Sequence, residues 1–165
     1  SRAIYIRGMT QAAPYLVDLI ANPDGPLAQF LCFSVYSTGL AFNRLYKPLL
    51  DRLGLTYLQY ITLIALSRRD DQTVKELGEA LFLESNTLTP LLKRLEASDL
   101  LTRRRDTADE RVVRLALTAQ GREVLRKARC VPEEVLEATG MAVEELIALN
   151  DQLKALRGHL QAGAR

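Results

Sequence analysis

The sequence predicts a mainly α-helical fold with one small β-hairpin. Three observations lead to this prediction. Apolar residues make up 48% of the chain but aromatic residues only 6%, and the abundant leucine, alanine, glutamate and arginine favour helices. Apolar residues recur at the three- and four-residue spacing of helices, with glycine and proline between the stretches. Only two short runs, residues 101–105 and 112–117, have a strand-like composition, and the polar loop 106–111 separates them.

The size and charge of the chain limit its function. Its 165 residues fit one domain, or one core with a helical dimerisation arm. The formal net charge is only +2, so any affinity for nucleic acid must come from a local basic patch. No apolar stretch is long enough and free enough of charge to cross a bilayer, and no signal peptide is recognised. We therefore expect a cytoplasmic protein without membrane contact.

Cysteine and histidine are scarce. Two cysteines in a cytosolic protein are more typical of reactive or incidental thiols than of a structural disulfide. The single histidine, His159, leaves no His/Cys metal site and is expected to be solvated near a helix end. We expect no bound metal, no cofactor and no enzymatic activity.

The N-terminal region, residues 1–26, is expected to be an extension. The chain begins with Ser1 rather than methionine, so residues 1–8 are a candidate tag remnant, and a short helix is expected over 14–21. Pro26 suits the first turn of a long helix, which Pro48 should bend and Gly54 can end. The apolar residues of this helix form a broad stripe: Leu27, Phe30, Leu31, Val35, Phe42, Leu45 and Leu49.

Two capping boxes follow. Thr56 with Gln59 opens a helix to about residue 67, and Thr73 with Glu76 opens another through residue 80. After a short turn, a third helix is expected over 85–97, which we call the recognition helix. The hairpin over 101–117 comes next, and we call it the wing. Together these elements predict a winged helix-turn-helix over residues 55–118.

The C-terminal part is again helical. A helix is expected from about residue 119, with a break near Gly140 and a restart to about residue 160. The last segment has leucines at alternating spacings of three and four: Leu146, Leu149, Leu153, Leu156 and Leu160. This pattern indicates a seam for a partner helix, and core packing within one chain is the alternative. We therefore assign residues 27–54 and 119–165 to a helical dimerisation region.

The recognition helix predicts a DNA-binding surface. In a helix-turn-helix, early residues of the second helix face base edges in the major groove, where short polar side chains reach the bases. The candidates are Ser85, Asn86, Thr87, Thr89, Lys93 and Arg94. The inward face is expected to be Leu88, Leu91, Leu92 and Leu95. Pro90 removes one backbone donor, so we expect a tight or distorted first turn rather than a break.

The wing is basic. From Lys93 to Arg114 the chain has seven basic and five acidic residues. Arg103, Arg105 and Asp109 are DNA-interface candidates, and Arg111 at the tip suits the narrow minor groove. Asp109 and Glu110 are expected to brace the loop through ion pairs. Alone, such a hairpin is equally typical of a solvated charged surface, but its place after a helix-turn-helix favours DNA binding.

Cys32 lies in an apolar stretch and suggests a redox switch. A thiol reacts with peroxide as the thiolate, which phenol hydroxyls stabilise by hydrogen bonds. Tyr36 shares the helix face of Cys32, but Tyr46 is fourteen residues away, roughly 21 Å along a helix. Antiparallel two-fold packing of this helix would bring Tyr46 of one subunit, joined by Tyr57, to Cys32 of the other. Little help is expected from the helix dipole, because the predicted helix begins well before Cys32.

Several segments carry a resemblance to a known family. They are Gly54-Leu-Thr-Tyr-Leu-Gln-Tyr60, Thr73-Val-Lys-Glu-Leu-Gly78, Asn86-Thr-Leu-Thr-Pro-Leu-Leu-Lys-Arg-Leu-Glu96 and Asp109-Glu-Arg111 with Leu117-Thr118. From about Leu27 to beyond Gly121 the chain resembles the MarR family, most closely its organic-hydroperoxide regulator (OhrR) branch. The resemblance implies a homodimeric winged helix-turn-helix repressor on a palindromic operator. It also implies a reactive Cys32 with Tyr36, Tyr46 and Tyr57 in its site, the last two supplied across the dimer.

The resemblance further implies a mechanism. The reduced dimer binds double-stranded operator DNA, and it releases the DNA after an organic hydroperoxide oxidises Cys32. In two-cysteine members of the branch, a resolving cysteine of the other subunit then forms a disulfide with the oxidised cysteine. That resolving cysteine lies near the position of Glu137 here. Cys130 occupies a helix face similar to that of this resolving cysteine, but it lies at a different height along the helix. Either Cys130 resolves Cys32, or it is a bystander and a small thiol does so.

Three rival functions stay open. A MarR-type regulator gated by a small aromatic ligand would leave Cys32 inert. A thiol peroxidase would turn over hydroperoxide, but the chain lacks the Pro/Thr/Arg group that such enzymes place beside the thiol, and they need no wing. A DNA-bending or scaffolding protein would sense nothing.

Overall fold

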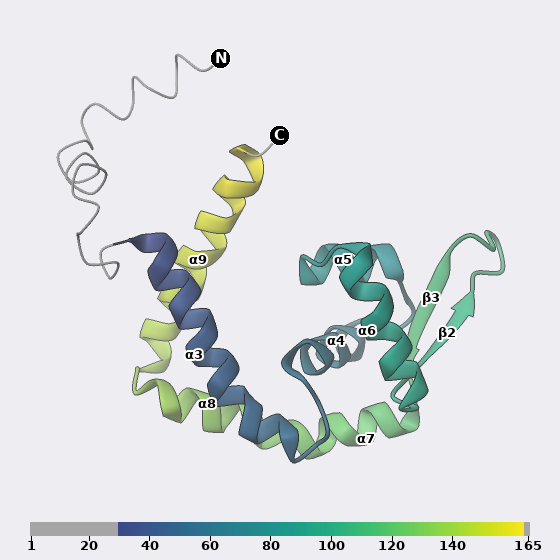
Figure 1. The fold of residues 1–165 in the computed structure, drawn as a ribbon, viewed down its shortest axis with the longest axis horizontal. Coiled ribbons are helices and arrows are strands. Elements are labelled where there is room, and N and C mark those ends of the chain that lie inside the picture. The colour runs from purple at the N-terminus through teal and green to yellow at the C-terminus, as the bar shows by residue number, and fades with distance from the viewer. Residues whose placement is uncertain (1–29, 164–165) are drawn as a thin grey trace. The chain divides into compact units, whose positions relative to one another are not determined.

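The computed structural model describes residues 30–163, so the predicted extension 1–26 and the predicted helix 14–21 lie outside the described residues. The described chain is mainly helical with one small antiparallel sheet, and the predicted fold class is confirmed (Figure 1). It divides into two compact units, one up to Arg44 and one from Leu45 onward.

Helix α3, Leu31–Asp51, belongs to both units and continues through Pro48. The prediction of a start at Pro26 was wrong for this helix, because the Phe30 carbonyl accepts the Ser34 amide at 2.9 Å and α3 begins at Leu31. Gly54 has φ +67°, the left-handed conformation predicted for the residue that follows the helix.

The two predicted capping boxes are confirmed. Helix α4, Tyr57–Arg68, begins after Thr56, whose amide donates to Gln59 Oε1 at 2.8 Å and whose hydroxyl accepts the Gln59 amide at 3.3 Å. Helix α5, Val74–Leu81, begins after Thr73 with the same reciprocal bonds to Glu76, at 2.8 and 3.1 Å. Each box satisfies backbone donors that the helix start leaves unpaired.

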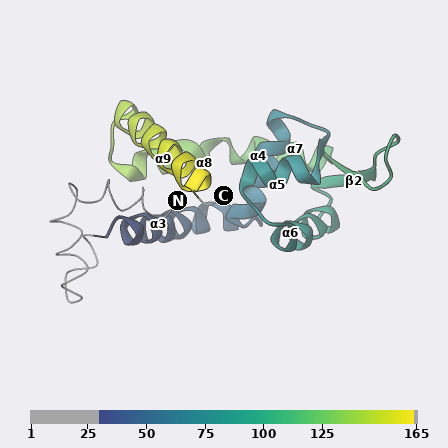
Figure 2. The same cartoon turned by 90° about the horizontal axis from the view of Figure 1, so that it is seen from above.

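The sheet has three strands in the order β1–β3–β2, all antiparallel. Strands β2, Leu101–Arg105, and β3, Val113–Leu117, form the predicted wing, which projects beyond α4, α5 and the recognition helix in both views (Figures 1 and 2). Strand β1, Gln72–Thr73, was not predicted. Two residues are too few to show an alternating pattern, and the strand exists because Gln72 and Thr73 pair with Leu115 and Arg114.

Leucines form most of the core of the second unit. The recognition helix is α6, Ser85–Ala97, and its predicted inward face is confirmed because Leu88, Leu91, Leu92 and Leu95 are all buried. These side chains share one cluster with buried residues of α4, α5 and the sheet, among them Leu63, Leu66, Leu77, Leu101 and Leu115. The packing fixes how the recognition helix and the wing stand relative to each other.

The C-terminal region contains more breaks than predicted. Helices α7, Ala119–Lys127, and α8, Val131–Thr139, are separated by the short 3₁₀ turn η2, Ala128–Cys130. Gly140, with φ +64°, ends α8 as predicted, and α9 spans Val143–Gly163. None of the side chains of α9 is buried, and His159 is exposed as expected. Among residues 30–163, no helix is both long enough and apolar enough to cross a bilayer.

Candidate nucleic-acid interface and thiol site

The recognition helix presents its predicted polar residues to solvent. Helices α5 and α6 are joined by a turn in which Phe82 takes a left-handed conformation, with φ +55°. Gly78 permits the close approach of the two helices, because a Cβ there would lie 3.1 Å from the Leu83 carbonyl oxygen and 3.3 Å from Leu88 Cδ2. All six predicted DNA-contacting residues of α6 are exposed: Ser85, Asn86, Thr87, Thr89, Lys93 and Arg94.

The first turn of α6 is tight, as the sequence predicts. The Glu84 carbonyl accepts both the Thr87 amide at 3.0 Å and the Leu88 amide at 2.9 Å, so a 3₁₀-type bond accompanies the first α-helical one. Pro90 is exposed and does not interrupt the helix. The hydroxyl and amide side chains at this end therefore project from a helix whose opposite face is packed in the core.

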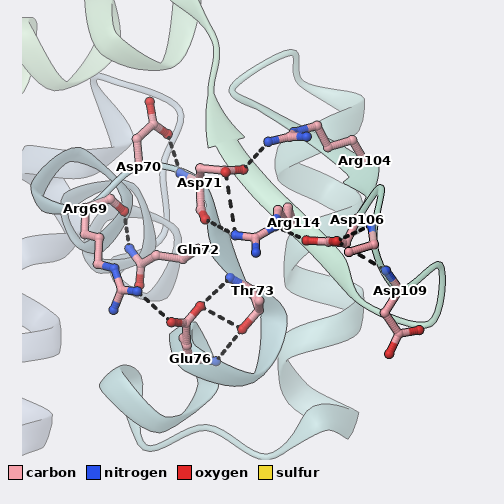
Figure 3. Close-up of polar contacts among 11 residues, drawn as sticks. Arg69, Asp70, Asp71, Gln72, Thr73, Glu76, Arg104, Asp106, Asp109 and Arg114 are labelled. Atoms are coloured by element: carbon pink, nitrogen blue, oxygen red, sulfur yellow. Dashed lines mark hydrogen bonds and ion pairs between the residues drawn. The ribbon is translucent and has the colours of Figure 1, made fainter.

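The wing contains an ion-pair network centred on Asp71, at the end of its strands nearest the loop (Figure 3). Arg104 of β2 and Arg114 of β3 are direct cross-strand partners. Asp71 lies between them, 2.7 Å from Arg104 Nη2 and 3.6 Å from Arg114 Nη1. Arg114 also donates to the Asp71 carbonyl at 3.0 Å and to the Asp106 carboxylate.

The loop at the tip of the wing is held by Asp106 rather than by ion pairs of Asp109 and Glu110, which were the prediction. Asp106 Oδ1 accepts the Ala108 amide at 2.8 Å, and Asp109 Oδ1 accepts the Arg111 amide at 3.0 Å. Hydrogen bonding from Arg114, followed by that from the Ala108 amide, lowers the pKa of Asp106 to about 2. Asp106 and Asp109 bind backbone amides because carboxylates in a short loop lie nearest to the unpaired amides of the same loop.

The arginines of the wing differ in their surroundings. Arg103 is 3.5 Å from Glu96 of α6, and its buried Nε has no acceptor among the described residues. Arg105 Nη1 reaches only the Glu110 carbonyl, at 3.5 Å. Arg105 and Arg111 are exposed, and within residues 30–163 neither has a carboxylate within ion-pair distance. These two cations are therefore available to a phosphate backbone.

The predicted reactive cysteine lies in the first unit. Cys32 is exposed and is the second residue of α3, so it lies in the first helical turn rather than beyond it. Its apolar neighbours Leu31 and Val35 are 62% and 45% exposed, and Tyr36 is 62% exposed with its ring centroid 6.5 Å from that of Phe33. The expectation that Cys32 lies beyond the first helical turn was therefore wrong, because α3 begins only one residue before it.

The other predicted tyrosines lie in the second unit, where they form a cluster. The ring centroids of Tyr46 and Tyr57 are 4.7 Å apart, and Tyr60 joins them at 6.1 Å from Tyr46. Burial raises the pKa of Tyr46, and Tyr57 and Tyr60 raise it further. The pKa of Tyr60 is raised as well, first by burial and then by Tyr57, so the phenols of Tyr46 and Tyr60 keep their protons at neutral pH and can donate hydrogen bonds. Their approach to Cys32 of a second subunit stays a prediction.

Cys130 lies at the end of η2 and is exposed. A hydrogen bond to Glu134 raises the pKa of the Cys130 thiol, burial adds to this effect, and Arg52 opposes it. Cys130 in turn contributes to the raised pKa of Tyr60, after burial and Tyr57. The second cysteine is thus electrostatically coupled to the tyrosine cluster. Across residues 30–163, no group of histidine, cysteine and carboxylate side chains could hold a metal ion.

Comparison with known proteins gives the family. The family model described as transcriptional regulator SarA/Rot matches residues 44–128. The organic hydroperoxide resistance transcriptional regulator of Bacillus subtilis is 42% identical over 126 residues, which are 76% of this chain and 86% of that protein. This chain belongs to the MarR/SarA-type transcriptional regulators. The predicted family is confirmed, and the Bacillus subtilis relative supports its organic-hydroperoxide regulator branch.

Two further relatives agree with this assignment to the MarR/SarA-type regulators. The HTH-type transcriptional regulator TtmR of Methylorubrum extorquens is 48% identical over 134 residues, 81% of this chain and 69% of that protein. The structure of reduced AbfR bound to DNA is 34% identical, with a TM-score of 0.68, over 81% of this chain and 94% of that chain. AbfR bound to DNA is also known in an overoxidised form, at the same identity and TM-score.

Some residues of this MarR/SarA-type regulator escaped the sequence analysis. Tyr60 completes the tyrosine cluster, and its three-residue spacing from Tyr57 on α4 was the available signal. Asp71 and Asp106 organise the wing, and no pattern in the sequence pairs them with Arg104 and Arg114. The structure brings together Tyr46 with Tyr57. Cys32 and Tyr36 belong to the other unit.

Proposed function

We propose that this chain is a redox-sensing transcriptional repressor. It binds operator DNA as a homodimer when reduced, and it releases the DNA when an organic hydroperoxide oxidises Cys32. The observation that carries the proposal is the exposed Cys32 thiol, set among exposed apolar side chains in the first turn of α3. An inert core cysteine would be covered within its own chain, whereas this one is open to a reagent or a partner.

DNA binding rests on two exposed surfaces of the second unit. The first turn of α6 offers Ser85, Asn86 and Thr87 to base edges in the major groove. The wing offers Arg111 to the minor groove and Arg105 to phosphates. DNA-bound AbfR, a relative of the same fold, supports this assignment.

The homodimer rests on two helices that each expose several apolar residues. On α3, Leu31, Val35 and Tyr36 are exposed. On α9, Ile147 and Leu160 are 58% and 65% exposed, and the predicted leucine seam lies along the same helix. Several exposed apolar side chains along one helix are typical of an interface between subunits. Two copies of one chain also match a palindromic operator.

Oxidation of Cys32 follows ordinary thiol chemistry. The Sγ thiolate attacks the outer oxygen of the hydroperoxide, an S–O bond forms and the O–O bond breaks. Sulfur loses two electrons, and the leaving alkoxide takes up a proton to become an alcohol, so Cys32 becomes a sulfenic acid. Phenol donors from Tyr46 and Tyr57 of the second subunit stabilise the thiolate before attack.

Cys130 is our candidate for the resolving thiol. Its sulfur attacks the sulfenic sulfur of Cys32 in the other subunit, an S–S bond forms, and the S–O bond breaks with loss of water. Two observations support this role: Cys130 is exposed, and it is coupled to the tyrosine cluster that is expected to receive Cys32. A disulfide between subunits would displace the dimer helices and change the spacing of the two recognition helices.

The test measures operator binding against oxidation state. The reduced protein first selects a duplex from a random-sequence library, and fluorescence anisotropy compares that duplex with a scrambled one. We expect a preference of about a thousandfold or more, and its loss after one equivalent of cumene hydroperoxide. Cys32→Ser should keep its DNA through the same treatment. Cys130→Ser is the matched control, because it removes a thiol but leaves the sensing thiol in place. Peroxide is kept stoichiometric, since overoxidised AbfR was obtained bound to DNA.

Each rival function gives a different result in this test. Binding that ignores peroxide in the wild type, but falls when a small aromatic acid is added, indicates a ligand-gated regulator. Release that also occurs in Cys32→Ser contradicts the assignment of the sensing thiol. Consumption of many equivalents of hydroperoxide in the presence of dithiothreitol indicates a thiol peroxidase.

A further inference from the structure

Two arginines of the wing stand in an unfavourable position. Arg104 and Arg114 are direct partners across β2 and β3, on the face of the hairpin opposite Leu115. Like charges directly opposite each other in an antiparallel pair destabilise it. A hairpin with this pair needs a carboxylate between the two guanidinium groups, or else the side chains must separate.

Asp71 supplies that carboxylate from outside the hairpin. Asp71 immediately precedes β1, which pairs with β3. This pairing places Asp71 beside Arg104 and Arg114. Its two carboxylate oxygens face one arginine each, at 2.7 and 3.6 Å. Asp71 has φ +57°, an uncommon conformation for a residue other than glycine, which aspartate tolerates better than most. The backbone therefore accepts some strain at the position of this carboxylate.

The network decides which wing cations are free. Arg104 is engaged by Asp71, and Arg114 by Asp71 and Asp106. Arg105 and Arg111 have no such partner within the described part of the chain. Without Asp71, Arg104 would lose its carboxylate partner and Arg114 would keep only Asp106, so the wing would present one or two more mobile arginines to DNA phosphates. Phosphate contacts raise affinity for all DNA sequences alike and carry no information about bases.

We propose that Asp71 is a specificity-determining residue of this repressor. By holding Arg104 and Arg114 on the hairpin, it keeps them from non-specific phosphate contacts and confines the wing's contribution to Arg105 and Arg111. The inference rests on the proposed DNA-binding function. It assigns to Asp71 control over the ratio of operator binding to non-specific binding.

The test is the salt dependence of DNA binding by reduced Asp71→Asn, on the selected duplex and on the scrambled one. Each freed arginine that reaches a phosphate should steepen the slope of log K against log salt by about 0.9. One or two such contacts correspond to roughly a 3- to 12-fold greater loss of affinity between about 50 and 200 mM salt. We expect tighter binding to the scrambled duplex at low salt and a smaller preference for the selected one.

Three further variants make the result specific. Asp151→Asn makes the same change in net charge on α9, where Asp151 pairs with Lys154, and should leave the slope unchanged. Asp71→Gly removes the carboxylate and relieves the left-handed backbone, so it should reproduce the slope of Asp71→Asn even if the asparagine variant folds poorly. Adding Arg104→Gln and Arg114→Gln to Asp71→Asn should restore the wild-type slope.

The two proposals fail in distinguishable ways. If the wild type does not prefer its selected duplex over the scrambled one, the repressor function is wrong. If the wild type prefers it but Asp71→Asn keeps the wild-type slope and preference, only the role of Asp71 is wrong. A lower melting temperature of Asp71→Asn with an unchanged slope also overturns that role, because it reports a purely structural contact.

Discussion

Gly121→Ala gives a sharp test of how the wing is anchored to the rest of the domain. Gly121 lies in the first turn of α7, just after the N-cap Thr118. A Cβ at this position would lie 2.0 Å from the Leu100 carbonyl oxygen and 3.3 Å from Leu117 Cδ2. Leu100 immediately precedes β2 and Leu117 ends β3, so the contact joins α7 to the base of both wing strands.

The magnitude follows from opposing effects. A carbon–oxygen contact needs about 3 Å, so α7 and Leu100 must separate by about 1 Å, and overpacking of this kind typically costs about 1–3 kcal/mol. The Thr118 amide donates to the same Leu100 carbonyl at 3.3 Å, and loss of that bond adds about 1 kcal/mol. Alanine favours a helix over glycine by up to about 1 kcal/mol. The net expectation is a loss of about 1–3 kcal/mol of unfolding free energy, or roughly 2–12 °C in melting temperature.

The assay is thermal and urea unfolding followed by circular dichroism, at one fixed protomer concentration because the stability of a dimer depends on it. Gly158→Ala is the matched control, since a Cβ at Gly158 in α9 meets no atom within 4 Å. That control should gain stability by about 0.5–1 kcal/mol from helix propensity alone. If Gly121→Ala is as stable as the wild type or more stable, the packing of α7 against Leu100 is not as described, and the reasoning is refuted.

Four other changes test the thiol site, the wing and a helix cap. Tyr46→Phe removes one phenol donor to the Cys32 thiolate and should slow sulfenic acid formation about tenfold, measured by dimedone labelling, without changing operator affinity. Glu134→Gln removes the carboxylate that raises the pKa of the Cys130 thiol. Because a lower pKa leaves more thiolate at pH 7–8, disulfide formation should be faster in that range. The rate of disulfide formation should also level off at a lower pH than in the wild type. Arg105→Ala should weaken binding to operator and scrambled duplexes and make the salt slope shallower by about 0.9, and an unchanged slope would place the Arg105 guanidinium away from phosphate. Thr56→Ala removes the N-cap of α4 and should cost about 1 kcal/mol of unfolding free energy in the same urea assay.

Local chemistry let the sequence determine most of the elements. Thr56 and Thr73 cap their helices because each has a partner side chain three residues later. The leucines of α6 bury one helix face because their spacing follows the helical repeat. Gly54 and Gly140 follow helices because glycine adopts positive φ without strain. Each of these features depends on residues within a few positions of one another, so the sequence alone was enough.

The features that the sequence did not determine depend on residues far apart in the chain. Strand β1 exists only because β3 is beside it, and Asp71 acquires its role only when β1 carries it between Arg104 and Arg114. Tyr60 joins Tyr46 through the packing of α4 against α3. The clash expected at Gly121 likewise requires Leu100, which approaches through the fold rather than along the helix. Caps and helix faces are encoded by short-range sterics and hydrogen bonds, whereas the charge network of the wing arises when tertiary packing brings distant side chains within reach.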